Sequence, residues 1–138
     1  MSAKVFLDTN VFVYTQSSGE SVKRDIALKA LEKYNCCTSI QVFNEISNVM
    51  TRKLKMPIAE VKQIITAIND RCEISFISFE TIQKALDLKA VYGYSYYDSL
   101  ILATAVLSDC SYIFSEDLQD GQIVDNRVEI VNVFKRSI

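Results

Sequence analysis

The chain has 138 residues, of which 49% are hydrophobic and 23% are charged, and this length and composition fit a single globular domain spanning residues 1–138. It contains no histidine, which excludes Ser-His-Asp catalysis, metal sites held by histidine and RNA cleavage by paired imidazoles. The formal net charge of −2 is not typical of a nucleic-acid binder, although a local basic patch or a bound cation could still provide such binding.

Hydrophobic periodicity predicts short strands that alternate with helices along the whole chain. In chain order we expect a strand at 5–7, a helix at 22–34, a strand at 36–38, helices at 40–54 and 61–68, a strand at 74–77, helices at 79–90 and 97–107, and strands at 112–114 and 128–133. The helix at 97–107 is apolar almost all round, which is typical of a helix buried between layers. This alternation predicts a parallel sheet covered on both faces, in a three-layer α/β/α domain.

The cysteines and the chain start both indicate a reducing compartment. Cys36, Cys37, Cys72 and Cys110 have no C-x-x-C spacing, and we interpret them as small buried apolar residues. The N-terminal residues do not resemble a signal peptide, and the longest apolar stretch, 100–107, is too short to span a membrane. We therefore expect a cytoplasmic protein without membrane association.

Acidic residues stand where a parallel α/β sheet binds its ligands, beyond the carboxyl ends of the strands. Asp8 directly follows the first strand and Asp117 follows the fourth, while Asp98 begins the buried helix. Glu45 lies in the second turn of a helix that Ser39 can cap. Taken singly, each acid is equally well explained as a helix cap, a partner of the helix dipole or a solvated side chain.

The four acids together predict a shared metal site. Several carboxylates in one pocket would repel one another and raise their pKa values unless a cation neutralised them. Mg²⁺ and Mn²⁺ prefer oxygen ligands, and one or two such ions can polarise a phosphodiester and activate a water molecule. In a chain without histidine, this is the hydrolytic chemistry that we expect.

Four ordered motifs resemble the PIN domain family, a metal-dependent nuclease fold, and within it the VapC-like toxins of bacterial toxin–antitoxin pairs. The motifs are VFLDTN at 5–10, QVFNE at 41–45, YYDSLI at 96–101 and FSEDL at 114–118, so the resemblance runs essentially from end to end. It implies a sheet of order 3-2-1-4-5, in which the ends of the first and fourth strands lie side by side. This agrees with the rule that ligands bind where the strand order reverses.

The resemblance also implies the residues of the site and the partners of the protein. The metal-binding and catalytic acids would be Asp8, Glu45, Asp98 and Asp117, with polar support from Thr9, Asn10 and Ser115. Asp120 is a possible additional metal ligand, and either Glu116 or Asp120 could take the place of Asp117. The protein would be an endoribonuclease dependent on Mg²⁺ or Mn²⁺, homodimeric, and restrained by a small cognate antitoxin that covers the active site.

Two further groups could contact RNA. A basic cluster at the end of the helix that carries Glu45 could bind phosphates, or could simply complement the helix C-terminus: Arg52, Lys53 and Lys55. A run of tyrosines before Asp98 could stack on bases, although packing with satisfied hydroxyls explains them better: Tyr92, Tyr94, Tyr96 and Tyr97. Hydrolysis by an activated water would leave 5′-phosphate and 3′-hydroxyl ends.

Three other interpretations compete with a nuclease. A non-enzymatic phospho-receiver domain also binds Mg²⁺, but it needs its acceptor Asp after the third strand, where Ser78 and Phe79 stand. A haloacid-dehalogenase-like phosphatase needs a second Asp two residues after Asp8, where Asn10 stands. A degenerate PIN-like module that only binds RNA or protein remains open, although the presence of all the acids argues against it.

Overall fold

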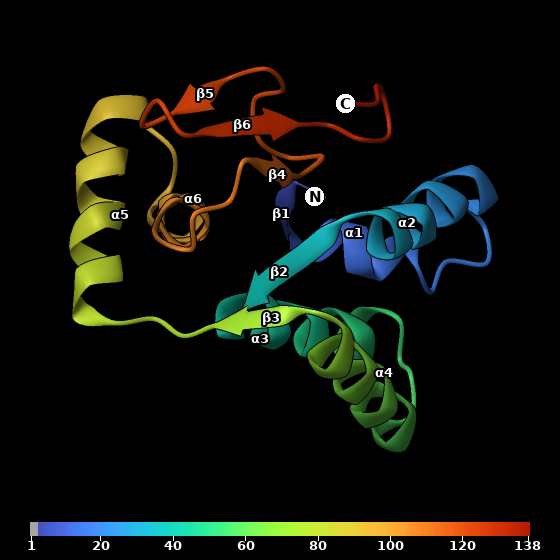
Figure 1. Cartoon of the computed structure of the whole chain (residues 1–138). Coiled ribbons are helices and arrows are strands. Elements are labelled where there is room, and N and C mark those ends of the chain that lie inside the picture. Colours follow the sequence, from blue (N-terminus) through green and yellow to red (C-terminus); the bar gives the residue numbers. More distant parts are fainter. Residues whose placement is uncertain (1–2) are drawn as a thin grey trace.

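The computed structural model describes residues 3–138, which form one mixed sheet covered by helices on both faces (Figure 1). The strand order is β3-β2-β1-β4-β6-β5. The strands are β1 (Lys4–Leu7), β2 (Asn35–Ser39), β3 (Glu73–Ser75), β4 (Tyr112–Phe114), β5 (Ile123–Val124) and β6 (Val128–Val131). All pairings are parallel except that between β5 and β6. The predicted α/β class is confirmed.

The helices form the two outer layers. On one side of the sheet lie α5 (Phe79–Tyr92) and α6 (Tyr96–Leu107) (Figure 1). The other helices are α1 (Thr9–Tyr14), α2 (Ser21–Lys33), α3 (Ile40–Asn48) and α4 (Ile58–Arg71). The first turn of α5 begins with a capping box in which the Ser78 and Thr81 side chains bond to each other's backbone N–H. Gly93, at φ 78°, ends this helix in the left-handed conformation that glycine adopts without strain.

The sheet has one more strand than the sequence predicts. The expected fifth strand corresponds to β6, and the additional β5 pairs with it in antiparallel register through Val124 and Val128. The chain turns between them at Asp125 and Asn126, which have positive φ angles of 54° and 53°. Two consecutive left-handed residues produce the tight hairpin turn that matches strand twist, and Asp and Asn tolerate it well. A strand of two residues is too short to give a periodic signal.

Two helical segments also differ from the prediction. The short helix α1, which follows Asp8, was not expected because its alternating β-branched residues Val11 and Val13 resemble a strand. The predicted helix at 40–54 contains α3 but continues as a π-helical segment, η1 (Val49–Lys53). Only α1 matters for the site, because its first turn carries two of the polar residues described below.

The buried hydrophobic residues form one cluster around the sheet. In β1, Val5, Phe6 and Leu7 are completely buried, and in α6 eight consecutive residues from Ser99 to Val106 are buried. This confirms the prediction of a helix enclosed between layers. The four cysteines are free and buried, as expected of small apolar residues. Within residues 3–138, no helix is both long and apolar enough to cross a membrane.

Candidate active site at the carboxyl edge of the sheet

The pairing of β1 with β4 places Asp8 beside the residues that follow β4. Leu7 lies opposite Phe114 in the parallel register, and the Asp8 N–H donates to the Phe114 carbonyl at 3.1 Å. The Asp8 side chain is buried, with 6% of the residue exposed. One of its oxygens, Oδ1, accepts from the Thr9 N–H at 2.7 Å, and Oδ2 accepts from the Ser115 hydroxyl at 2.7 Å. Asp8 is therefore both the cap of α1 and a buried carboxylate at the centre of the edge.

The pKa of Asp8 depends on its burial and on the groups around it. Burial is the largest effect and raises the pKa of Asp8 from 3.8 to about 6, against the hydrogen bonds from Ser115 and Thr9, which lower it. The negative charges of Glu45 and Asp117 raise this pKa further. Glu45 and Asp117 are thus each close enough to repel the charge of Asp8, which is the electrostatic condition that a cation relieves.

The Glu45 carboxylate is held by residues of two helices. Its Oε2 accepts a short hydrogen bond from the Thr9 hydroxyl at the start of α1. Its Oε1 accepts from the Gln41 amide, one turn earlier in α3, at 3.3 Å. The Ser39 hydroxyl caps α3 by accepting from the Val42 N–H at 3.3 Å, as the sequence predicts. These bonds fix Glu45 against the N-terminus of α1.

The Asp117 carboxylate lies on the other side of Asp8. Its Oδ2 accepts from the Asn10 side-chain amide at 3.1 Å, and its backbone N–H donates to the Ser115 hydroxyl oxygen at 3.2 Å. Ser115 therefore donates to Asp8 and accepts from Asp117 in the same network. Each of the three polar residues predicted to support the site contacts at least one of the acids: Thr9, Asn10 and Ser115.

Asp98 is joined to this network through the backbone of α6. It lies in the first turn, where its N–H donates to the Ser95 cap at 3.1 Å. The Gln41 amide nitrogen that contacts Glu45 also donates to the Tyr97 carbonyl at 3.0 Å, which ties this turn to α3. Within residues 3–138, the Asp98 carboxylate has no hydrogen-bond partner, so it is not committed to a structural role.

The two other candidates for the fourth acid are engaged elsewhere. Glu116 accepts from the Lys23 ammonium at 2.6 Å and from the Tyr14 hydroxyl at 2.7 Å. Burial acts to raise the pKa of Glu116, but these two hydrogen bonds outweigh it and the pKa lies below its usual value. Asp120 accepts from the Asn132 N–H at 2.9 Å and pairs with Arg136 at 2.9 Å, and the Asn132 bond is the main reason its pKa is lowered. The geometry favours Asp117 over both.

Gln41 is a part of the site that sequence reasoning missed. Only 6% of the residue is exposed, and its Oε1 is buried without a hydrogen-bond partner within residues 3–138. The only other such side-chain atom in this part of the chain is the Ser99 hydroxyl, directly after Asp98. Of the two, only Gln41 contacts a predicted acid, through the hydrogen bond from its amide to Glu45. The signals in the sequence are the place of Gln41 at the start of the QVFNE motif and its four-residue spacing from Glu45, which places the two on one helix face.

The donor set fits a hard divalent cation, although the acids do not enclose a preformed site. Within residues 3–138, no group of three Asp, Glu, His or Cys side chains is close enough together to hold a metal ion. The carboxylates of Asp8, Glu45 and Asp117 nevertheless interact electrostatically, and carboxylate oxygens are the ligands that Mg²⁺ and Mn²⁺ prefer. The buried Gln41 Oε1, which has no partner within the described residues, also fits a site that binds hydrated ions, because the same side chain contacts Glu45.

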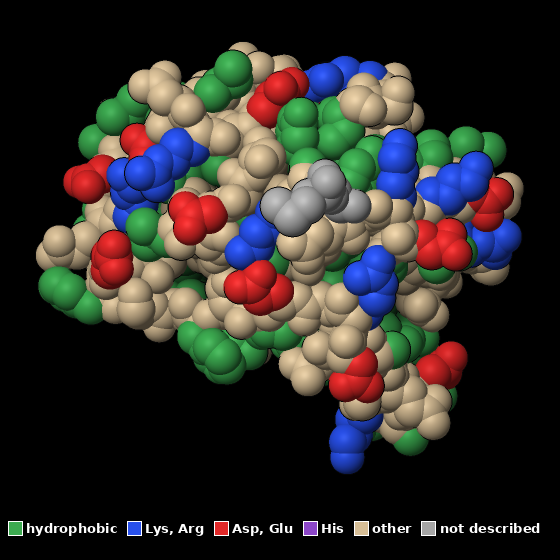
Figure 2. Space-filling model, viewed as in Figure 1, with side chains coloured by type: hydrophobic (Ala, Val, Ile, Leu, Met, Phe, Trp, Pro, Cys, Tyr) green, Lys and Arg blue, Asp and Glu red, His purple; other side chains and the backbone are tan. Residues whose placement is uncertain are grey.

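In the described part of the chain, only Tyr97 of the residues predicted to contact RNA is joined to this network, through its backbone carbonyl. Arg52, Lys53 and Lys55 are exposed at and after η1 and form no ion pair within residues 3–138. Of the tyrosines before Asp98, Tyr92 accepts from the Asp125 N–H at 2.9 Å and is occupied in packing. Tyr97 is 67% exposed. On the face drawn in Figure 2, acidic and basic side chains are interspersed.

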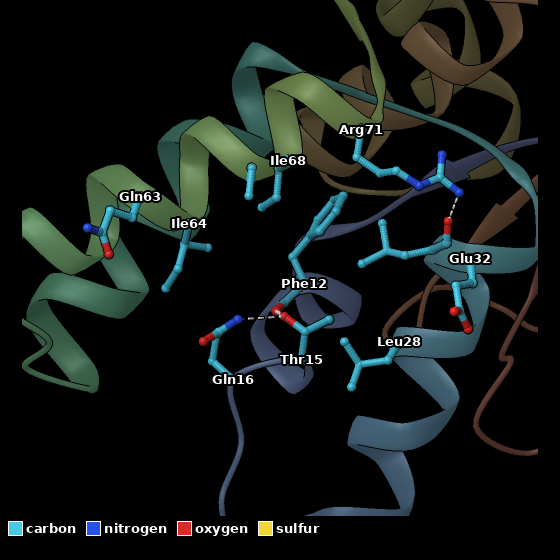
Figure 3. A pocket seen from close by; sticks show the side chains of 11 residues that line it. Phe12, Thr15, Gln16, Leu28, Glu32, Gln63, Ile64, Ile68 and Arg71 are labelled. Atoms are coloured by element: carbon cyan, nitrogen blue, oxygen red, sulfur yellow. Dashed lines mark hydrogen bonds between the residues drawn. The ribbon is translucent and has the colours of Figure 1, made fainter.

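A separate apolar groove of about 720 Å³ lies between α1, α2 and α4. Figure 3 shows Phe12, Leu28, Ile64 and Ile68 pointing into it. At one end the Arg71 guanidinium donates to the Leu31 carbonyl, which links α4 to α2. Leu28 is 45% exposed, so the groove presents apolar surface to solvent. Phe12 of this groove lies in α1, the helix that Asp8 caps; we call the region of Asp8, Glu45, Asp98 and Asp117 the acidic edge.

The fold and the site together define a class: a three-layer α/β domain with carboxylates gathered where β1 and β4 end. The sequence matches the PIN domain family over residues 5–133, and the chain belongs to this family. No match was found among curated proteins.

Solved structures share this fold over nearly the whole chain. A toxin–antitoxin complex from Klebsiella pneumoniae has a TM-score of 0.71 at 21% identity, covering 94% of this chain and 97% of that one. The Mycobacterium tuberculosis toxin VapC20, described as cleaving the sarcin–ricin loop, has a TM-score of 0.67 at 14% identity, covering 82% and 91%. VapBC2 from Rickettsia felis, bound to a promoter DNA fragment, has a TM-score of 0.67 at 15% identity, covering 94% and 99%. These TM-scores show a common fold, and at identities below 25% they show the fold alone.

Proposed function

We propose that the protein is a toxin ribonuclease, an endonuclease that hydrolyses RNA phosphodiester bonds with Mg²⁺ or Mn²⁺ held by carboxylates. One observation carries the proposal: the buried Asp8 carboxylate lies within the electrostatic reach of both Glu45 and Asp117, at the edge of the sheet where ligands bind. Membership of the PIN family and the fold shared with the toxin VapC20 support the assignment.

Asp8, Glu45, Asp98 and Asp117 would hold the metal. A bound divalent ion supplies positive charge next to the scissile phosphate and lowers the pKa of a water molecule so that it can attack. The chain itself keeps the acids apart and oriented. Ser115 and Thr9 hold the two oxygens of Asp8, Thr9 and Gln41 hold those of Glu45, and Asn10 holds Asp117. Asp98 lies in the first turn of α6, next to the Ser95 cap.

The reaction would add water across the P–O3′ bond. Because the chain has no histidine to activate a ribose 2′-hydroxyl, we expect 5′-phosphate and 3′-hydroxyl products rather than a 2′,3′-cyclic phosphate. Asp8, buried and with its pKa raised to about 6, is the acid whose charge depends most on a nearby cation. Metal binding would therefore release a proton from Asp8 at mildly acidic pH.

Cleavage of RNA with and without Mn²⁺ tests the proposal. Asp98→Asn should lower the metal-dependent rate at least about a hundredfold, because the loss of a ligand charge removes several kcal/mol of stabilisation. Asp87→Asn, on the exposed side of α5, is the matched control and should retain full activity. Equal activity in wild type and Asp98→Asn would point to a contaminating nuclease. RNA binding without cleavage in the wild type would instead favour a degenerate PIN module.

We also propose that a cognate antitoxin inserts an apolar segment into the groove between α1, α2 and α4. The groove has the apolar lining that such a segment needs, and its Phe12 wall belongs to the same short helix as Thr9 and Asn10. A chain seated there would lie beside the acids. The relative from Klebsiella pneumoniae was solved as a toxin–antitoxin complex, which supports a partner of this kind. Co-purification with the product of a small adjacent reading frame would test it.

The remaining expectations concern assembly and location. The outer face of α5 exposes Phe79 and Leu86, seven residues apart, with Ile82 between them and Phe76 just before the helix. A contiguous apolar stripe of this kind suits a homodimer interface. Light scattering of Leu86→Glu, which should be monomeric if the stripe pairs two copies, checks this. We further propose that Arg52, Lys53 and Lys55 contact RNA phosphates, and that this one-domain protein acts in the cytoplasm.

A further inference from the structure

A second concave region lies on the opposite face of α2 from the apolar groove. It has a volume of about 370 Å³ and is formed by α2 and the segment that follows β6. From α2 and its end come Lys29, Lys33 and Tyr34, and from the C-terminal segment come Phe134 and Lys135. Figure 1 shows the C-terminal segment passing close to α2. We call this region the cationic cleft.

The charge of the cationic cleft is of one sign. No acidic residue is among those that line it, and the acid of α2 nearest in sequence, Glu32, lines the apolar groove instead. Within residues 3–138, none of Lys29, Lys33 and Lys135 pairs with a carboxylate. Arg136, by contrast, is neutralised by Asp120 and by Glu129. Lys135 lies near enough to Glu116 and Asp120 to lower their pKa values, but it forms no ion pair with either within the described residues. All three lysines can therefore contact an external anion, in a chain whose overall charge is −2.

Aromatic rings lie among these lysines. Tyr34 and Phe134 are half-buried and line the cleft, and the Lys33 ammonium lies 5.2 Å from the centre of the Tyr34 ring. Cations interleaved with aromatic rings are the combination that binds single-stranded nucleic acid, since phosphates pair with the cations and bases stack on the rings. An acidic peptide would use the lysines but not the rings.

The cationic cleft is connected to the acidic edge through three direct contacts. The Phe134 ring packs against Tyr14 with a centroid separation of 4.9 Å, and the Tyr14 hydroxyl donates to Glu116 at 2.7 Å. Glu116 directly precedes Asp117. The same loop is held from α2 by Lys23, which pairs with Glu116 at 2.6 Å. An RNA strand that ran from the acids across the loop of Glu116 and Asp117 would enter the cationic cleft.

We propose that the cationic cleft binds the phosphate backbone of single-stranded RNA on one side of the scissile bond. The cleft supplies local positive charge in addition to Arg52, Lys53 and Lys55, and such charge is needed because RNA must be attracted to a site made of carboxylates. This inference rests on the proposed nuclease function for its substrate. The binding it predicts is nevertheless measurable without any cleavage.

The test measures RNA binding of a triple variant, Lys29→Gln, Lys33→Gln and Lys135→Gln. The probe is a fluorescein-labelled, unstructured single-stranded RNA of mixed sequence, and anisotropy is recorded in EDTA so that no metal-dependent hydrolysis occurs. The matched control also removes three exposed cations, from other parts of the surface: Lys62→Gln, Lys89→Gln and Arg127→Gln. The single variant Lys135→Gln and a melting curve for each protein verify that folding is intact.

The cleft variant should bind RNA about ten- to a hundredfold more weakly than wild type, and the control should change little. The slope of log affinity against log salt should fall by about 2, because three phosphate contacts to single-stranded RNA contribute about 0.7 each. In cleavage assays with Mn²⁺, the cleft variant should have a higher KM for RNA than wild type and an unchanged kcat.

Several results would overturn the inference. These are equal losses in the two triple variants, unchanged affinity in the cleft variant, or no RNA binding by wild type. Polyglutamate serves as a second probe. If the cleft variant loses binding of polyglutamate but binds RNA as wild type does, the cleft is instead a surface for an acidic protein. If the wild type binds RNA through the cleft but never cleaves it, the nuclease proposal fails and the cleft inference stands.

Discussion

The short helix α1 separates two regions that are built in opposite ways. At its N-terminus, Asp8, Thr9 and Asn10 belong to a hydrogen-bonded network that gathers carboxylates. One turn further on, Phe12 lines the apolar groove, where Leu28 of α2 is 45% exposed. The acidic edge buries charge, and the groove exposes apolar surface.

Both regions contain features that lower the stability of the folded state. A buried carboxylate beside two other carboxylates costs free energy, and so does apolar surface left in water. The hydrogen bonds of Ser115 and Thr9 only partly offset the first cost, because the pKa of Asp8 stays raised at about 6. Such costs are understandable where a ligand removes them, a cation in one region and a partner segment in the other. The comparison predicts that variants of the two regions separate activity from partner binding.

The largest effect should follow Asp8→Asn, which keeps the shape of the side chain but removes its charge. Metal-dependent RNA cleavage should fall at least about a hundredfold. At neutral pH without metal the variant should be more stable than wild type, since asparagine avoids burying a charge. A variant that lost stability as well as activity would mean that the Asp8 charge supports the fold.

The stability difference between wild type and Asp8→Asn should depend on pH. Because the folded pKa of Asp8, about 6, exceeds the ordinary value of 3.8, the folded state binds the proton more tightly than the unfolded state. The resulting stability is fully present below about pH 4 and is lost as pH rises through about 6, a change on the order of 3 kcal/mol. Urea unfolding in EDTA near pH 4 and pH 7 should show this difference between wild type and Asp8→Asn.

An intermediate effect should follow Leu28→Lys in the groove. A charge in place of a leucine that the partner would cover should weaken binding of the antitoxin about ten- to a hundredfold, with RNA cleavage by the free protein unchanged. Calorimetric titration with the purified partner measures it. Val22→Lys, on an exposed position of the same helix outside the groove, should bind normally. Weakening by both variants alike would place the partner elsewhere.

The smallest effect should follow Gln41→Met, which preserves size but removes the amide that joins Glu45 to the Tyr97 carbonyl. As a positioning residue, Gln41 should influence kcat by about three- to tenfold, because a misplaced ligand loses part of its advantage. KM for RNA should be unchanged. Gln83→Met, exposed on α5, serves as the control. A change in KM alone would indicate that Gln41 contacts RNA and does not orient Glu45.

Most of the architecture was readable from local pattern. The order of strands and helices, the buried α6 and the placement of Asp8 after β1 follow from hydrophobic periodicity, which depends on neighbours in sequence. The exceptions are short. The helix α1 has β-branched residues that resemble a strand, and β5 has only two residues, so neither provides enough turns or alternations for a periodic signal.

The sequence predicts the acids of the site as a set. Which of several neighbouring acids is free to join the site depends on contacts between residues far apart in the chain. Glu116, Asp117 and Asp120 are equivalent in sequence, whereas Lys23 occupies the first and Arg136 the third, 93 and 16 residues away along the chain. Gln41 entered the site through a bond to a carbonyl 56 residues away. The cationic cleft joins α2 to the C-terminal segment, and no window of the sequence contains both.

By itself the sequence determined the chemical repertoire: no imidazole, several carboxylates, and strands that end where those carboxylates begin. The tertiary structure decided which charges meet. The register of β1 against β4 brings Asp8 to Ser115, and the burial that follows raises the pKa of Asp8. The physical reason is that secondary structure depends on nearby residues, while electrostatic interaction depends on distance in space and on exclusion of water, both of which only packing sets.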